Sequence, residues 1–132
     1  MGSMKLLLDT HVLLWAVLEP QKLSSQLCEA LEDSDNVLLV RAATAWEIAT
    51  KWRLGKLRQA SAVVHNYRMA LDGLAASEIP ISGEVARRAG LWEVPHRDPF
   101  DRLLAAQAVA AQLVLASQDE AFNQFDGLEL LS

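Results

Sequence analysis

Residues 5–9 form the segment Lys5-Leu6-Leu7-Leu8-Asp9, a short apolar run that ends on an acidic residue. Two later segments repeat the same kind of run, at Val37–Val40 and at Leu113–Ser117. Short runs of Leu and Val bounded by polar residues are typical of strands that are buried on both faces of a parallel sheet. The three runs therefore predict the centre of such a sheet, with Lys5–Asp9 as its first strand.

Helix-forming segments separate these strands. We expect a helix capped by Thr10 that ends before Pro20, and a second helix capped by Ser24 or Ser25. Further helices are expected over residues 42–54, 59–71, 82–90 and 100–112, with a brief helix at 120–124. Shorter strands are expected at residues 78–81 and, as an edge strand, at 127–131. The alternation of strands and helices predicts one α/β domain with a mainly parallel central sheet.

The composition suits a folded domain of 132 residues. Hydrophobic residues make up 52% of the chain and charged residues 22%, which argues against disorder. No apolar run approaches the roughly 18 residues that span a bilayer, and no signal-peptide pattern opens the chain, so we expect a cytoplasmic protein. Cys28 is the single cysteine, which excludes an intramolecular disulfide. The opening Met1-Gly2-Ser3 indicates a cloning remnant, so the expected domain comprises residues 4–132.

Charge is distributed unevenly along the chain. The net charge of −5 counts against non-specific binding to a polyanion. Residues 41–68, however, contain six basic residues against Glu47 alone, a local charge of +5, whereas residues 1–40 and 103–132 carry −4 each. The basic segment is either a solvated helix face or a track for phosphate groups, and both interpretations stay open at this stage.

Acidic residues recur where the predicted strands end. Asp9 ends the first strand, Asp119 follows the strand at 113–117, and Glu47 lies about two turns into the helix after Val37–Val40. Asp98 and Asp101 lie at the start of the helix that leads into the strand at 113–117. Ligands of open parallel sheets bind beyond the carboxyl ends of the strands, so these carboxylates are expected to converge there. Clustered carboxylates need a compensating charge, and oxygen ligands favour Mg²⁺ or Mn²⁺.

Each of these acids also has a structural interpretation. Asp9 and Asp119 can cap helices, and Glu47 can pair with Lys51 four residues later. Asp98 precedes Pro99 and is more typical of an N-cap than of a ligand. Asp101 can pair with Arg97 or Arg102. The sequence has no Cys/His spacing typical of zinc sites, no phosphate-binding Gly-rich loop with Lys and no Gly-x-Ser-x-Gly motif, so the carboxylates are the only candidate for catalysis.

Four motifs resemble those of PIN-domain ribonucleases, and within them the VapC-type toxins of bacterial toxin–antitoxin systems. The resemblance extends over residues 4–132 and is carried by Leu6-Leu7-Leu8-Asp9-Thr10-His11 with Leu14-Trp15-Ala16, by Ala45-Trp46-Glu47-Ile48-Ala49, by His96-Arg97-Asp98-Pro99-Phe100-Asp101-Arg102, and by Ser117-Gln118-Asp119-Glu120-Ala121-Phe122. It implies a three-layer α/β/α sandwich and a Mg²⁺- or Mn²⁺-dependent endoribonuclease. It also implies the toxin role in a type II pair, a cognate VapB-type antitoxin, and a homodimer.

The resemblance carries the catalytic and metal-binding tetrad of the family onto Asp9, Glu47, Asp101 and Asp119. Asp9, Asp101 and Asp119 are expected to hold the cation, while Glu47 completes the shell or orients the attacking water. Ser117 is expected to support the metal site, and Asp98 is a neighbour that is either a further support or a helix cap. The products implied are a 3′-hydroxyl and a 5′-phosphate. Two positions depart from the family: Arg41 stands where relatives often have Ser, and Gln118 where they usually have Arg.

An RNA-binding track is expected on the basic residues, namely Arg41, Lys51, Arg53, Lys56 and Arg58, with Arg97 and Arg102 near the acids. Trp46 and Trp52 are expected in the core, with a stacking surface on Trp52 as the alternative. His11 and His96 are expected to cap helices or lie at the surface. The apolar residues of segments 13–18 and 27–31 either form a groove for an antitoxin or belong to the core.

Two rival functions fit an α/β domain with acids at its strand ends. A Mg²⁺-binding receiver domain of a signalling system would need an acidic pair beside the first strand and a Lys after the last, and the sequence has neither. A catalytically silent binding module would explain an acidic surface without turnover, and its test is whether a divalent ion binds through Asp119.

Overall fold

The computed structural model describes residues 3–96 and 98–132. Met1, Gly2 and Arg97 lie outside the described residues, and with them the predicted RNA contact of Arg97 and most of the expected cloning remnant. None of the helices in the described part of the chain is long and apolar enough to cross a membrane.

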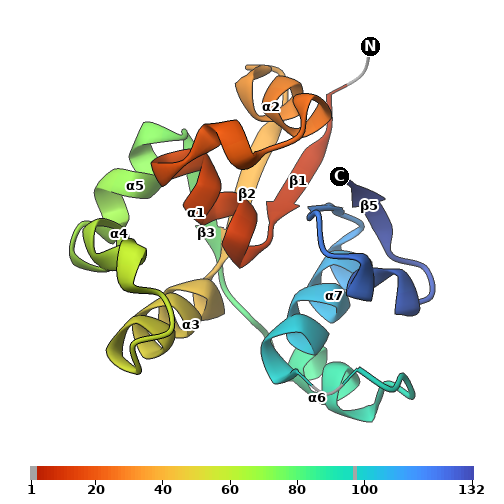
Figure 1. The fold of residues 1–132 in the computed structure, drawn as a ribbon. Coiled ribbons are helices and arrows are strands. Elements are labelled where there is room, and N and C mark those ends of the chain that lie inside the picture. Colours follow the sequence, from red (N-terminus) through yellow and green to blue (C-terminus); the bar gives the residue numbers. More distant parts are fainter. Residues whose placement is uncertain (1–2, 97) are drawn as a thin grey trace.

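Five parallel strands form one sheet in the order β3-β2-β1-β4-β5 (Figure 1). In chain order the strands are β1 (Lys5–Leu8), β2 (Val37–Arg41), β3 (Ala76–Ile79), β4 (Val114–Ala116) and β5 (Glu129–Leu131). The central strand β1 pairs with β2 on one side and with β4 on the other, so that Leu7 lies between Leu39 and Leu115. The predicted edge strand near the C-terminus is therefore confirmed as β5.

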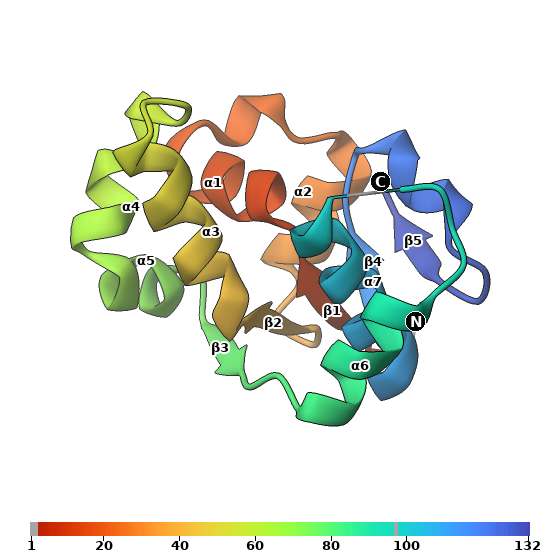
Figure 2. The same ribbon diagram turned by 90° about the horizontal axis from the view of Figure 1, so that it is seen from below.

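Helices cover both faces of the sheet (Figure 2). One layer contains α1 (Thr10–Leu18), α2 (Ser25–Glu32), α3 (Ala42–Arg53), α4 (Ser61–His65) and α5 (Tyr67–Gly73). The other contains α6 (Gly83–Leu91), α7 (Pro99–Ala111) and the short 3₁₀ helix η3 (Glu120–Gln124). Two more 3₁₀ turns, η1 (Pro20–Lys22) and η2 (Arg58–Ala60), connect elements of the first layer. The predicted three-layer α/β/α sandwich is confirmed.

Alternation along β1 divides the core into two parts. Leu6 and Leu8 pack with Val12, Leu13 and other residues of the α1–α5 layer. Leu7 points to the opposite face, where it packs with Leu104 and the rest of the α7 side. Because successive side chains of a strand point to opposite faces, a strand covered on both sides is apolar at every position. This explains the uninterrupted Leu run of the first strand.

The helix predicted over residues 59–71 is wrong in its continuity. The chain forms η2, α4 and α5 instead, and the helical backbone is interrupted at Asn66, which has φ −138° and ψ 47°. The side-chain Nδ2 of Asn66 donates to the carbonyl of Ala62 at 3.4 Å. Asn side chains compete with the backbone for such partners, which favours a helix end over continuation.

Candidate functional site

The candidate site lies at the carboxyl ends of β1 and β4. The strand order reverses between these two neighbours, since the chain runs from β1 outward to β3 and then crosses to β4. Ligands of open α/β sheets bind in the crevice at such a reversal. Asp9 immediately follows β1, while Ser117 and Asp119 follow β4.

Asp9 is buried and caps helix α1. Its Oδ1 accepts a hydrogen bond of 2.7 Å from the N–H of Val12, so Asp9 takes the N-cap role predicted for Thr10. Burial raises the pKa of Asp9, although the Ser117 hydroxyl and the Val12 N–H partly oppose this shift. The nearby charge of Asp101 raises the pKa further. A bound cation would lower the pKa of Asp9 again, because its positive charge favours the ionised carboxylate.

Glu47 lies on α3 and is also buried, with all of its polar contacts supplied by the chain itself. Thr10 Oγ1 donates to Glu47 Oε1 at 2.6 Å, and Arg41 Nη2 donates to the same oxygen at 3.3 Å. Lys51 Nζ donates to Oε2 at 2.6 Å. Both carboxylate oxygens are therefore engaged, and Glu47 bridges two basic side chains. The interpretation of Glu47 as a partner of Lys51 is confirmed.

Asp101 lies in the first turn of α7 and contacts a histidine. His96 Nε2 lies 2.8 Å from Asp101 Oδ2, whereas Arg102, one of the two predicted partners, donates to backbone carbonyls instead; the other predicted partner, Arg97, lies outside the described residues. Burial raises the pKa of Asp101, and the His96 hydrogen bond opposes that shift while the charges of Asp98 and Glu47 add to it. Asp98 caps α7, since its Oδ1 accepts from the N–H groups of Phe100 at 2.8 Å and Asp101 at 3.3 Å.

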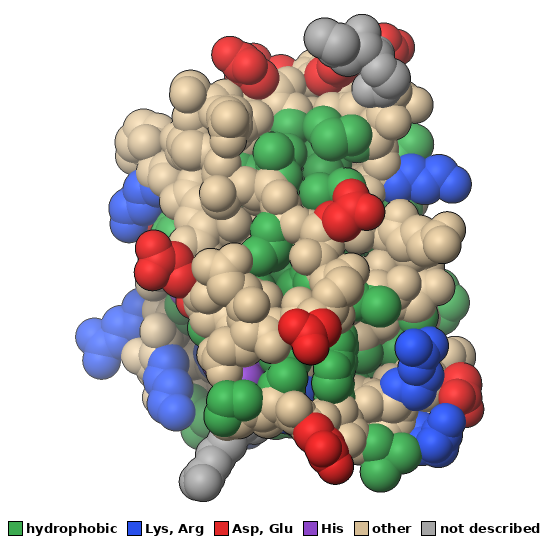
Figure 3. Space-filling model, turned by 90° about the vertical axis from the view of Figure 1, so that its right-hand side faces the viewer, with side chains coloured by type: hydrophobic (Ala, Val, Ile, Leu, Met, Phe, Trp, Pro, Cys, Tyr) green, Lys and Arg blue, Asp and Glu red, His purple; other side chains and the backbone are tan. Residues whose placement is uncertain are grey.

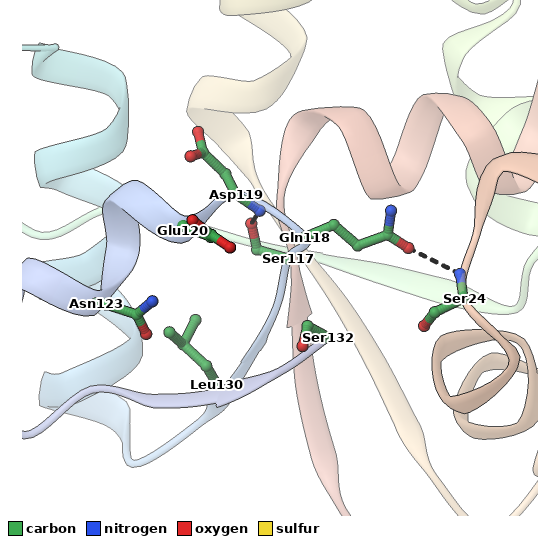
Figure 4. Close-up of a pocket in the computed structure, with 8 residues that line it drawn as sticks. All are labelled: Ser24, Ser117, Gln118, Asp119, Glu120, Asn123, Leu130 and Ser132. Atoms are coloured by element: carbon green, nitrogen blue, oxygen red, sulfur yellow. Dashed lines mark hydrogen bonds between the residues drawn. The ribbon is translucent and has the colours of Figure 1, made fainter.

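Asp119 is exposed and lies between two pockets. It caps η3 by accepting from the N–H of Ala121 at 2.9 Å, and its own N–H donates to Ser117 Oγ at 3.1 Å. One pocket, of about 320 Å³, is lined by Asp9, His11, Trp15, Gln118 and Asp119. The second, of about 340 Å³, lies beside Ser117 and is shown in Figure 4, where Gln118 reaches across to the N–H of Ser24. Asp9 and Asp119 thus share the wall of one cavity.

The donor set fits a hard divalent cation. Asp9, Asp101 and Asp119 offer oxygen ligands only, and in the described residues neither Asp9 nor Asp119 forms a salt bridge. Burial is the main cause of the raised pKa values of Asp9 and Asp101, and a neighbouring carboxylate raises each of them further. Across residues 3–96 and 98–132, no three acidic, His or Cys side chains are already close enough to enclose an ion. Closure around an ion would require these carboxylates to turn from their helix caps or from His96.

A family model of the PIN domain matches residues 6–128 of the chain. The chain belongs to the PIN domain family. Among curated protein sequences, none matches it.

Three solved structures resemble this PIN domain over nearly their whole length. VapBC2 from Rickettsia felis, bound to a DNA fragment from its promoter, aligns with a TM-score of 0.68 and 16% identity over 97% of this chain and 98% of that one. DNA-bound VapBC from Salmonella typhimurium aligns with a TM-score of 0.66 and 16% identity over 97% of each chain. VapBC-1 from nontypeable Haemophilus influenzae aligns with a TM-score of 0.64 and 14% identity over 98% of each chain. At this identity the likeness supports the fold of the PIN domain.

Two residues of the predicted RNA track have other roles in this PIN domain. Arg41 has no exposed surface, so the prediction that it contacts RNA is wrong. Arg102 donates through Nε to the carbonyl of Ala89 at 3.1 Å and through Nη1 to His96 and Val94, with Trp92 as a further acceptor. These contacts hold the segment before α7, and the RNA contact predicted for Arg102 stays a prediction.

The remaining basic residues lie on or after α3, on the side of the candidate site. Arg53, Lys56 and Arg58 are exposed, and Lys51 is half-buried beside Glu47. Burial lowers the pKa of Lys51, but the Glu47 hydrogen bond and the neighbouring carboxylates outweigh it, so the net shift is upward. Lys51 therefore stays protonated at neutral pH. The role of these four residues as a phosphate track stays a prediction.

The predictions for the aromatic residues are confirmed only in part. Trp46 was expected in the core but is 65% exposed, with its ring edge-on to Phe100 at 4.9 Å. Trp46 lies on the exposed face of α3, whereas Ile48, two residues later, faces the core. Trp52 is half-buried against His65. Leu13 and Leu27 belong to the core, whereas Val17, Leu18 and Leu31 are only half-buried, so a groove for an antitoxin on segments 13–18 and 27–31 stays a prediction.

Sequence reasoning missed two residues that touch the acids. Thr10 was assigned to a cap and instead donates to Glu47, and His96 was assigned to the surface and instead contacts Asp101. Their positions inside the quoted motifs, next to Asp9 and five residues before Asp101, were the available signal. Contacts between α1 and α3 have no signature in local spacing, because the two residues are 37 positions apart.

Proposed function

We propose that this PIN domain is a divalent-metal-dependent endoribonuclease of the VapC type, the toxin of a type II toxin–antitoxin pair. The observation that carries the proposal is that Asp9 and Asp119 line one cavity at the strand-order reversal, with the Asp101 carboxylate near enough to raise the pKa of Asp9. Membership of the PIN domain family supports a nuclease.

The carboxylates of Asp9, Asp101 and Asp119 would hold Mg²⁺ or Mn²⁺. Ser117 would fix the turn after β4 that carries Asp119, because its hydroxyl accepts from the N–H of Asp119. The ion supplies Lewis acidity toward a phosphodiester and lowers the pKa of water. Thr10, Arg41 and Lys51 hold Glu47 in place, so that its negative charge would lie beside the proposed metal ligands. Lys51, Arg53, Lys56 and Arg58 would hold RNA phosphates by charge.

A VapB-type antitoxin is proposed as the protein partner, and a homodimer as the assembly. The support for the antitoxin is that the similar structures from Rickettsia felis, Salmonella typhimurium and Haemophilus influenzae are all structures of VapBC. The homodimer is proposed from the family resemblance alone. The cytoplasm, where RNA is available, is the proposed location. Co-expression with the gene preceding this one tests the partner by co-purification.

RNA cleavage tests the catalytic proposal. A structured RNA should be cut by the wild-type chain in Mn²⁺ and left intact in EDTA. Asp101→Asn keeps the shape of the side chain and removes its charge, so we expect the cleavage rate to fall by roughly 100-fold or more. Glu84→Gln, at an exposed position on α6, is the matched control and should cleave normally. Cleavage by Asp101→Asn at the wild-type rate would refute the assignment.

A further inference from the structure

Arg41 is a buried cation that pairs with Glu47 and lies within the electrostatic reach of the acids of the candidate site. It ends β2 at the N-cap position of α3, and its side chain has no solvent-exposed surface. Long basic side chains are rarely buried completely unless they are paired, because removing a charge from water is costly. Something at this position must compensate the guanidinium.

The partners that Arg41 does have are few. Its Nη2 donates to Glu47 at 3.3 Å, whereas Nε and Nη1 are buried without a hydrogen-bond partner among the described residues. One moderate ion pair does not satisfy a guanidinium with five donor hydrogens. The compensation therefore comes mainly from charge at short range.

That charge is provided by the acids of the site. The carboxylates that act on Arg41 electrostatically are those of Glu47, Asp101, Asp98 and Asp9. The guanidinium thus lies within the field of the same carboxylates that are proposed to hold the metal ion. Its positive charge is permanent, since Arg stays protonated in proteins.

Counting charges limits what else the site can accept. The carboxylates that act on Arg41, those of Glu47, Asp101, Asp98 and Asp9, bring four negative charges, whereas Asp119 is exposed to solvent. Arg41 and Lys51 bring two positive charges, both paired with Glu47. One divalent ion neutralises the remainder, and a second would leave the site with an excess of positive charge.

We propose that Arg41 is a built-in counter-ion that takes the electrostatic place of a second metal ion, so that this PIN domain binds one divalent ion per chain. Glu47 is then a positioning residue, held by Arg41 and Lys51 and not available as a ligand. This inference rests on the proposed function, because it assumes that the carboxylates bind a divalent ion.

Calorimetric titration of the full chain with Mn²⁺ tests the proposal without any RNA. Arg41→Met keeps the length of the side chain and removes its charge, while Arg41→Lys keeps the charge. Arg87→Met, on an exposed residue of α6, removes a distant charge as a control. We expect one Mn²⁺ for the wild type, Arg41→Lys and Arg87→Met. Arg41→Met should bind two Mn²⁺ ions, the first at least tenfold more tightly than the wild type binds its one, and a single ion in Arg41→Met overturns the proposal.

Two Mn²⁺ ions in the wild type, or an affinity in Arg41→Met that is weaker or less than tenfold tighter, overturns the proposal. If the wild type binds no Mn²⁺, the proposed function fails and this inference fails with it. If it binds one and Arg41→Met is unchanged, only the inference fails.

Thermal unfolding in EDTA and in saturating Mn²⁺ covers the case in which Arg41→Met folds poorly. Without Arg41 the acids repel one another, so the variant should melt below the wild type in EDTA and gain more from Mn²⁺ than the wild type does. An equal or smaller gain, or a variant that stays unfolded in Mn²⁺, overturns the proposal.

Discussion

Asp9 combines a structural and a chemical role in one carboxylate. Its Oδ1 caps α1 through Val12, and the same side chain faces the cavity that it shares with Asp119. A cap needs only an acceptor, which Asn provides as well as Asp. The negative charge is therefore not needed for the cap, and its burial beside Asp101 is unfavourable in the metal-free chain.

Asp9→Asn is accordingly expected to stabilise the metal-free protein at neutral pH, by on the order of 1 kcal/mol. The pKa of Asp9 in the folded chain is raised above its ordinary 3.8. At pH values just above 3.8 the folded chain therefore binds more protons than the unfolded chain. The free energy of unfolding of the wild type in EDTA should then fall as pH rises above about 3.8. Urea unfolding from pH 4 to 7 checks this.

The sign of that pH dependence is the decisive feature. Asp9→Asn should show a flatter profile than the wild type, since one of the two raised groups is gone while Asp101 remains. A wild-type stability that rises through the same range would contradict the raised pKa values. If the free energy of unfolding has the same pH dependence in the wild type and in Asp9→Asn, Asp9 is not the source of that dependence.

At the scale of elements, helix α7 places one acid of the site through its start. Pro99 occupies the first turn and Asp98 the cap, which fixes Asp101 in the first turn facing His96. Both signals are local, so the sequence alone places this start within one residue. The cap interpretation of Asp98 follows from its bonds to Phe100 and Asp101.

Asp98→Ala should lower the free energy of unfolding by about 1 kcal/mol, because it leaves the first N–H groups of α7 without an acceptor. Asp98→Ser restores a cap without a carboxylate and should recover most of the loss. Chemical denaturation of the three proteins in EDTA measures both effects. Unchanged stability in Asp98→Ala, together with weaker Mn²⁺ binding in Asp98→Ser, would mark Asp98 as a ligand instead.

Elements with local signals were predictable from sequence, and contacts between distant elements were not. The Leu and Val runs predicted β1, β2 and β4, and Ser24 and Ser82 capped α2 and α6 as their positions indicated. The break at Asn66 and the exposure of Trp46 depend on tertiary packing. The burial of Arg41 had no signal in the sequence, because a basic residue in a basic segment is normally a surface residue.

The whole molecule carries its charges on different faces. On the face around α6, α7 and the C-terminal segment, acidic side chains are spread across the surface, and Lys and Arg lie toward its margins (Figure 3). The net charge of −5 therefore describes no single surface. RNA would meet the basic residues after α3, where Arg53, Lys56 and Arg58 are exposed.

Replacing Arg53 and Arg58 together by Gln should weaken RNA binding and its salt dependence. Each lost phosphate contact reduces the slope of log Kobs against log salt by about 0.7 for a single strand, so the pair should reduce it by about 1.4. Fluorescence anisotropy in EDTA with a single-stranded RNA measures the slope without cleavage. Arg87→Gln removes a charge on α6 and should leave the slope unchanged. An equal loss in Arg87→Gln would indicate diffuse attraction without a track.

The central claim is that the acids at the ends of β1 and β4 hold a divalent ion. The most direct measurement is anomalous diffraction at the manganese absorption edge from crystals of the full chain grown with Mn²⁺. We expect one anomalous peak per chain, within ligand distance of carboxylate oxygens of Asp9, Asp101 and Asp119, with Glu47 still bonded to Arg41 and Lys51. A peak elsewhere on the molecule, or none at saturating Mn²⁺, would contradict it.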